Sequence, residues 1–147
     1  MKIRSPLVTL LAGALLAGFA AGAEARDDRL KMPIADATAA GAGKLDGSVK
    51  FFWGSQSYPK SGKELGTYTS NKKTNFFNKS DKEGCEWAWL SAMIALQDRA
   101  KQEGGNAVVN IHSVYKNQDF SSETEYECGA GSVMGGVALR GTVVKLR

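Results

Sequence analysis

Residues 80–115 decide the fold, and they read SDKEGCEWAWLSAMIALQDRAKQEGGNAVVNIHSVY. Ser80 and Glu83 have the spacing of a capping box, which predicts that a helix begins close behind them. Apolar side chains then recur at helical spacing, and this predicts a helix from about Cys85 to Glu103 with one buried stripe: Trp89, Met93, Leu96 and Ala100. Gly104-Gly105 follows and ends the helix, because glycine is the usual residue just past a helix C-terminus.

The same helix carries a second apolar stripe, made of Trp87, Leu90 and Ile94. This stripe lies about 100° or more around the helix axis from the centre of the first. Two interpretations remain open: either the buried face is wide, or this side of the helix meets a partner. We favour the wide face, because helices of small domains often bury a broad arc. The three residues are kept as the candidate partner surface.

The chain after the helix predicts three strands. Residues 106–115 form the first, in which we expect three side chains to point one way: Ala107, Val109 and Ile111. Residues 123–128 form the second. They alternate strictly, with Thr124, Tyr126 and Cys128 on one face and Glu123, Glu125 and Glu127 on the other, which indicates a half-buried strand with an acidic solvent face. A glycine-rich connection at 129–136 leads to a last strand at Val137–Leu146.

The chain before the helix gives weaker signals. Leu30, Met32 and Ile34 alternate as in a short strand, and Pro33 restricts that strand to a sheet edge. The following segments are predicted, in order, as a short helix or linker (35–43), a strand (49–53), a loop (54–62), a strand (65–69) and a polar loop containing Phe76-Phe77 (70–84). One helix cannot cover both faces of a sheet. We therefore expect an α+β fold: a small antiparallel-rich sheet with one main helix packed on one face.

The N-terminus has the pattern of a secretory signal. Lys2 and Arg4 precede an uncharged stretch, Leu7–Ala21, and small residues flank Glu24 at a cleavage-type site. We expect a signal peptide at residues 1–25, cleaved after Ala25 or, as the main alternative, after Ala23. A transmembrane anchor is the weaker interpretation, since the stretch is shorter than the roughly 20 residues that span a bilayer.

The resulting organisation is a signal peptide, an N-terminal strand with a flexible segment (26–47), and one α+β domain (48–147). We expect the mature chain in the periplasm, with no stable membrane anchor after cleavage. The only two cysteines, Cys85 and Cys128, predict a disulfide that closes this domain. Chain-entropy arithmetic for the closed loop gives about 4 kcal/mol as an upper figure. A thioredoxin-like redox role is disfavoured because no C-x-x-C spacing is present.

Several kinds of chemistry find little support. His112 is the only histidine and has no nucleophile motif near it in sequence. The glycine-rich connection lacks the Lys-Ser/Thr pair of a phosphate-binding loop. Net charge is +4 with bases and acids interspersed, which disfavours a nucleic-acid partner. We expect no enzyme activity and no cofactor. The weak candidates for a ligand or metal site are His112, Glu123, Glu125 and Glu127.

The stretch Gly104–Val109, with His112-Ser113 and the later Cys128-Gly-Ala-Gly-Ser, resembles the RcsF/YbjQ-type domain family over about residues 48–147. RcsF is a periplasmic-facing sensor of outer-membrane stress, and YbjQ-type proteins have been described as heavy-metal-binding, ring-forming proteins. By position, Cys128 matches a disulfide cysteine of that family, and Cys85 matches one approximately. The chain lacks the lipid-attachment cysteine and has two cysteines rather than four, so sensing by a lipid tether does not carry over.

The stretches Leu30–Ala37 and Lys44–Lys50 resemble a group of short exported proteins that carry the name excinuclease ATPase subunit. That name implies nucleotide and DNA binding, which the missing phosphate loop and zinc-finger cysteines contradict. We therefore expect a non-enzymatic periplasmic binding or interaction domain, serving envelope homeostasis or stress sensing. Its partner is an envelope protein or a second copy of the chain. The alternative is a small-ligand or metal-binding protein.

Overall fold

The computed structural model describes residues 26–147, and the predicted signal peptide at 1–25 lies outside the described residues. The elements follow in the order β1 (Asp27–Pro33), α1 (Ile34–Ala40), β2 (Lys50–Trp53), β3 (Gly62–Asn75), α2 (Asp81–Gln102), β4 (Ala107–Ser113), the short 3₁₀ turn η1 (Tyr115–Asn117), β5 (Glu125–Gly131) and β6 (Met134–Leu146). No helix within this part of the chain is both long enough and apolar enough to cross a membrane.

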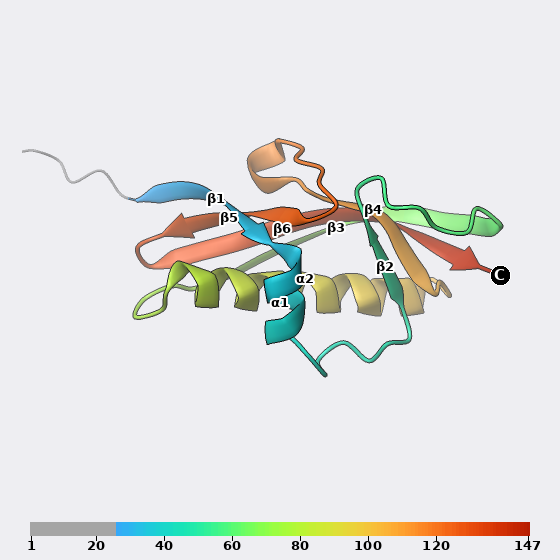
Figure 1. The fold of residues 1–147 in the computed structure, drawn as a ribbon, viewed down its shortest axis with the longest axis horizontal. Coiled ribbons are helices and arrows are strands. Elements are labelled where there is room, and N and C mark those ends of the chain that lie inside the picture. The colour runs from blue at the N-terminus through green and yellow to red at the C-terminus, as the bar shows by residue number, and fades with distance from the viewer. Residues whose placement is uncertain (1–25) are drawn as a thin grey trace, which may run out of the picture.

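All six strands belong to one sheet, in the order β1-β5-β6-β4-β2, and β3 pairs with the other edge of β6. β6 pairs with β3 along its whole length, whereas its opposite edge is shared by β5 and β4. Every pairing is antiparallel except that of β2 with β4. Helix α2 lies along one face of the sheet, and η1 stands on the other (Figure 1). The predicted α+β architecture is therefore confirmed.

Helix α2 begins at Asp81, four residues before the position expected from the apolar pattern. Ser80 is its N-cap, and the side-chain hydroxyl accepts a hydrogen bond from the Glu83 main-chain N–H at 3.1 Å. The predicted stripe is fully buried against β3 and β6: Trp89, Met93, Leu96 and Ala100. Gly104 ends the helix with φ of +77°, a conformation that glycine adopts without strain.

The core between α2 and the sheet is aromatic and is closed by the predicted disulfide. The indole rings of Trp53 and Trp89 stack with centroids 6.3 Å apart, and Tyr126 packs against Trp89. Cys85 and Cys128 are bonded with their Cα atoms 5.8 Å apart. This bond joins the first turns of α2 to β5, the fourth strand of the predicted domain.

Several element boundaries differ from the prediction; β5 and β6, for example, extend into the predicted connection at 129–136. Residues 70–75, expected as a loop, extend β3 to Asn75, because each of them pairs with β6 in register. Their side chains are mostly polar because β3 is an edge strand with much of its surface in solvent. Ile34, expected to end a strand, instead starts α1 and buries its side chain together with Ala37. The short helix that was one of two interpretations of 35–43 therefore forms as far as Ala40.

The predicted orientation of β4 is wrong because of a bulge. Asn110 has φ of +51°, and one extra residue separates the pairs Val109–Thr142 and His112–Arg140. Side chains on either side of the bulge therefore change faces. Ile111 packs with Val108 in the core under α2, whereas Val109 packs with Ala107 on the opposite face. His112 lies on the same face as Val109, not opposite it.

The glycine-rich connection is a tight hairpin between β5 and β6, in which Gly129 lies opposite Gly136. Its glycines leave room for aromatic rings. A Cβ on Gly135 would lie 2.5 Å from the Phe76 ring, and a Cβ on Gly129 would lie 2.0 Å from Tyr115. A side chain at either position would collide with a ring, so glycine is required for this close packing.

Candidate functional site

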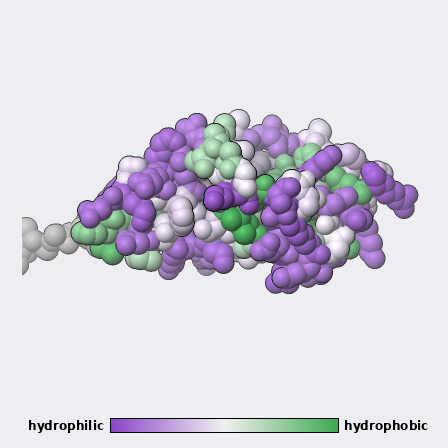
Figure 2. Space-filling view, turned by 90° about the horizontal axis from the view of Figure 1, so that it is seen from below, coloured by the Kyte–Doolittle hydropathy of each residue, from purple (hydrophilic) through white to green (hydrophobic). Residues whose placement is uncertain are grey.

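The second stripe of α2 is divided between core and solvent. Leu90 is half-buried and packs against the main core, over the main chain of Gly41 just beyond α1. Trp87 is 63 % exposed, and Ile94 is partly exposed. Figure 2, which views the helical side of the molecule, shows hydrophobic surface within a mostly hydrophilic face. We call Trp87, Leu90 and Ile94 the α2 surface.

Trp87 is held outward by its neighbours. Cys85 and Trp89, two positions away on either side, are fully buried. The disulfide at Cys85 and the Ser80 cap fix the first turns of α2. The main-chain carbonyl of Trp87 also accepts a hydrogen bond from the Ser91 hydroxyl at 2.9 Å. These contacts fix the orientation of the first turns of α2, so the helix cannot rotate to bury the Trp87 indole.

A groove runs beside this surface, between α2 and the edge strand β3. One hollow of about 430 Å³ is lined by Lys72, Lys73, Ser91, Ile94, Ala95 and Asp98. A second hollow, of about 300 Å³, lies next to it and shares Lys72 and Ala95. Within residues 26–147, Lys72 and Lys73 have no ion-pair partner, and neither has Asp98. The groove therefore combines an apolar wall with two lysines and one aspartate that lack ion-pair partners.

At the start of α2, Asp81 and Lys82 are paired within the described residues, whereas Glu83 has no ion-pair partner there. Lys82 forms ion pairs with Glu86 and Asp36, and the hydrogen bond to Glu86 is the main reason that the pKa of Lys82 is raised. Asp81 accepts two hydrogen bonds from Arg26, which lower the pKa of its carboxyl group. These pairs leave Trp87 as the dominant unsatisfied feature of the first turns.

The four candidate ligand residues do not converge. The Nδ1 atom of His112 lies 2.8 Å from the carbonyl oxygen of Asn110, and its Nε2 atom lies 4.0 Å from the Asp119 carboxylate. Glu123 accepts a hydrogen bond from the Ser55 hydroxyl at 2.9 Å. Glu125 is half-buried near the start of β5. Across residues 26–147, no three His, Cys, Asp or Glu side chains are grouped so that they could hold a metal ion.

Glu127 is buried, which corrects the predicted acidic solvent face. Its side chain is only 7 % exposed, and its carboxylate lies 3.5 Å from the Arg29 guanidinium of β1. Arg29 in turn packs over the Tyr115 ring and donates a hydrogen bond to the side chain of Gln118. The η1 segment has folded back across this face of β5. The predicted alternation of side chains is confirmed at Tyr126, Glu127 and Cys128, but a loop covers the face that was predicted to be exposed.

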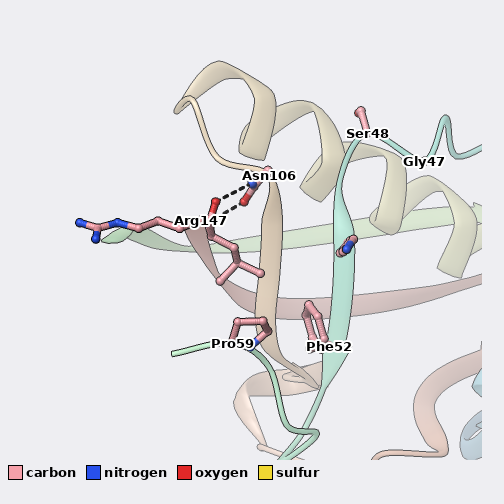
Figure 3. Close-up of a pocket in the computed structure, with 8 residues that line it drawn as sticks. Gly47, Ser48, Phe52, Pro59, Asn106 and Arg147 are labelled. Atoms are coloured by element: carbon pink, nitrogen blue, oxygen red, sulfur yellow. Dashed lines mark hydrogen bonds between the residues drawn. The ribbon is translucent and has the colours of Figure 1, made fainter. Parts of the chain in front are cut away.

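A pocket that no sequence pattern indicates lies on the sheet face opposite α2. It has a volume of about 250 Å³ and is lined by Gly47, Ser48, Lys50, Phe52, Pro59, Asn106, Leu146 and Arg147. Phe52 and Pro59 lie near one another at one end, Asn106 is bonded to β6, and Arg147 points away (Figure 3). The charged side chains in its lining are Lys50 and Arg147, and both are basic. Only the β2–β4–β6 order, which is not local in sequence, brings these residues together.

Comparison of the chain with protein-family models, with curated proteins and with solved structures finds no match. The resemblance to the RcsF/YbjQ-type family therefore stays a prediction.

Proposed function

We propose that this chain is an exported, non-catalytic binding domain of the periplasm, and that it binds an envelope protein through the α2 surface and the adjoining groove. The observation that carries the proposal is the exposure of Trp87, 63 % of which faces solvent on a helix whose other side is fully buried. The disulfide supports export, since such bonds persist in oxidising compartments. The resemblance to a family of envelope sensors supports a role in envelope homeostasis or stress sensing.

The composition of the site indicates the chemistry of the partner. Tryptophan is enriched at the energetic centres of protein interfaces because it buries a large area with few rotatable bonds. Ile94 extends the apolar contact toward the groove, where Lys72 and Lys73 have no carboxylate partner. The fitting partner is a protein segment that places apolar side chains on Trp87 and Ile94 and carboxylates beside the two lysines. Such an arrangement gives both affinity and charge-dependent selection.

The test begins with site-specific crosslinking in cells. A photo-crosslinking amino acid replaces Trp87 in one variant and Val133, which is 58 % exposed, in a matched control. We expect a discrete protein adduct from position 87 that is missing from position 133. The partner is then purified and titrated against the wild-type chain, Trp87→Ala and Lys72→Glu/Lys73→Glu.

We expect each variant to weaken binding at least about tenfold, as loss of a central interface residue commonly does. Unfolding midpoints should stay unchanged, because all three side chains are exposed. Equal affinity of wild type and variants would overturn the proposal. An adduct between two copies of the chain would replace the envelope protein by self-association.

A further inference from the structure

We propose that the partner segment which fills the groove is an extended strand that adds to the free edge of β3, so that the sheet continues into the partner. This inference rests on the proposed function and deepens it, because it names the conformation of the bound segment and the main-chain groups that hold it. The groove has the shape for such a segment. Its two hollows share Lys72 and Ala95, and together they follow β3 from Tyr68 to Lys73.

The three edge strands of the sheet, β1, β2 and β3, differ in how well they are protected against pairing. A free edge presents unpaired main-chain groups, and proteins protect such edges with charged side chains, proline, bulges or short strands. β1 has four charged residues and ends at Pro33. β2 is only four residues long. β3 is 14 residues long, and within residues 26–147 it pairs only with β6.

The protection of β3 is confined to its two ends. A bulge lies between Glu64 and Gly66, and Lys72 and Lys73 lie near the other end. The stretch between them, residues 67–71, reads TYTSN and has no charge, no proline and no bulge. Most of this stretch also lines the groove. The unprotected part of the edge and the groove therefore coincide.

The pairing of β6 shows which main-chain groups of β3 are free. In an antiparallel strand the N–H and C=O of one residue point to the same side, and successive residues alternate. Asn106 and Val114 flank β4, and their N–H groups donate to the carbonyl oxygens of Val144 and Ala138 at 3.0 and 2.9 Å. The even-numbered residues of β6 therefore direct their main-chain groups at β4. The odd-numbered residues direct theirs at β3.

The same alternation continues into β3. Tyr68 and Ser70 pair with odd-numbered residues of β6, so their N–H and C=O groups are used in that ladder. Thr67, Thr69 and Asn71 lie between and beside them, and direct their N–H and C=O groups to the open edge. Each of these three residues offers one donor and one acceptor. An added strand is the structure that satisfies donors and acceptors at this repeat.

The side chains of an added strand would meet the groove in a defined way. Alternate side chains point to opposite faces of a sheet, so every second one would face Ile94 and Ala95 of α2. A carboxylate on the bound segment fits beside Lys72 and Lys73, and a second carboxylate is disfavoured beside Asp98, which also lacks an ion-pair partner. A helical segment fits less well, because its main-chain groups are already bonded within the helix.

The first experiment measures the yield of the position-87 crosslinking adduct in cells, with a second substitution at Thr69. Thr69→Pro removes an outward N–H and should fold, because that N–H has no bond to β6 and proline is tolerated at such edge positions. We expect the adduct yield to fall at least about tenfold, since the proline ring also blocks the approach of a strand. Thr69→Ala keeps the N–H and should retain most of the yield. Unfolding midpoints of the purified chains verify that both are folded.

The second experiment measures amide hydrogen exchange by NMR, with the protein recovered from the position-87 adduct as the probe. In the free chain the amides of Tyr68 and Ser70 should exchange slowly and those of Thr69 and Asn71 quickly. On binding, exchange at Thr69 and Asn71 should slow at least about tenfold, because their N–H groups become hydrogen-bonded. This alternating pattern does not depend on any substitution.

The outcomes separate this inference from the proposed function. An equal adduct yield from the wild type and Thr69→Pro would leave the proposed function standing and overturn the added strand. So would unchanged exchange at Thr69 and Asn71 in the complex, or equal losses in Thr69→Pro and Thr69→Ala. An adduct of two copies of the chain would overturn the envelope protein as the occupant of the edge. The absence of any adduct from position 87 would overturn both proposals.

Discussion

Asn106 bonds to the main chain of Leu146 through both ends of its side-chain amide. The amide nitrogen donates to the Leu146 carbonyl oxygen at 2.9 Å, and the Leu146 N–H donates to the amide oxygen at 2.7 Å (Figure 3). The side chain thus pairs with β6 in the way a neighbouring strand would. Its neighbour Gly105 allows the same approach, since a Cβ there would lie 2.4 Å from Val143. The stretch Gly104-Gly105-Asn106 therefore attaches the end of β6 to the segment that follows α2.

Replacing Asn106 should therefore loosen the end of β6. We expect Asn106→Ala to lower the free energy of unfolding by about 2 kcal/mol, since each of these two part-buried hydrogen bonds contributes about 1 kcal/mol net. Asn106→Asp keeps the acceptor and loses the donor, so it should fall between wild type and alanine. Urea unfolding measures the difference, with Asn71→Ala at an exposed position of β3 as the control. Equal losses in Asn106→Ala and Asn71→Ala would contradict the assignment.

The disulfide should be a large part of the stability of the domain. It joins residues 43 positions apart, and closing a loop of that length restricts the unfolded chain by at most about 4 kcal/mol. We expect Cys85→Ser, or reduction of the wild type, to lower the free energy of unfolding by a few kcal/mol. Denaturation with and without reductant measures this loss. The variant should not respond to reductant, and identical midpoints for oxidised and reduced wild type would contradict the prediction.

The contact between Gly135 and Phe76 predicts coupled substitutions. Gly135→Ala places a Cβ 2.5 Å from the Phe76 ring, so we expect it to destabilise the domain by about 1–3 kcal/mol through overpacking. Phe76→Leu alone should also destabilise, because it shrinks a buried side chain. Combined, the two changes should cost less than the sum of their separate effects, since the smaller side chain relieves the clash with the ring, while the 2.6 Å approach to the Gly129 carbonyl oxygen remains. A double-mutant cycle measures this coupling, and strict additivity would show that the two residues do not interact.

Tyr126 predicts how stability depends on alkaline pH. Its hydroxyl group is buried without a protein hydrogen-bond partner. Burial, followed by the negative charges of Glu86 and Asp36, raises its pKa above the ordinary value of 10.0. The folded state therefore holds this proton more tightly than the unfolded state does. The resulting stability is complete below pH 10 and is lost as the pH rises beyond it.

Tyr126→Phe removes both the titration and the unpaired hydroxyl. We expect the variant to be at least as stable as the wild type at pH 7, and to lose less stability between pH 9 and about 11. Urea unfolding across this pH range measures both effects. Tyr58→Phe is the matched control, because Tyr58 lies outside the core beneath α2. A variant that is less stable at pH 7 and equally sensitive to alkali would contradict the prediction.

The elements that were predictable are those whose signals are local. Ser80 and Glu83 placed the start of α2 to within a few residues, and the stripe from Trp89 to Ala100 identified its buried face. The disulfide was predictable because the chain has only two cysteines. The β4 bulge was not predictable in this way, because Asn110 adopts its left-handed conformation only in the pairing with β6. A strict alternation rule then assigns Ile111 to the wrong face.

The candidate site was predictable only as a set of alternatives. The spacing of Trp87, Leu90 and Ile94 showed a second stripe, but whether α1 would cover it depends on contacts between segments far apart in sequence. The structure covers Leu90 and leaves Trp87 exposed. The burial of Phe76 and Phe77 could not be predicted either, because these two adjacent phenylalanines differ: Phe76 is buried and Phe77 is exposed. The pairing of Asn75 with Met134 decides which of them is buried, and no local pattern contains that information.

The position of β6 sets the order in which the molecule can assemble. β3, β4 and β5 all hydrogen-bond to β6, and β6 follows every one of them in the chain. None of these three pairings can form until residues 134–146 are present, whereas β1–β5 and β2–β4 can pair without them. A chain exported as we propose would thus enter a translocation channel with the centre of its sheet still unpaired. The topology therefore postpones closure of the sheet until β6 is available.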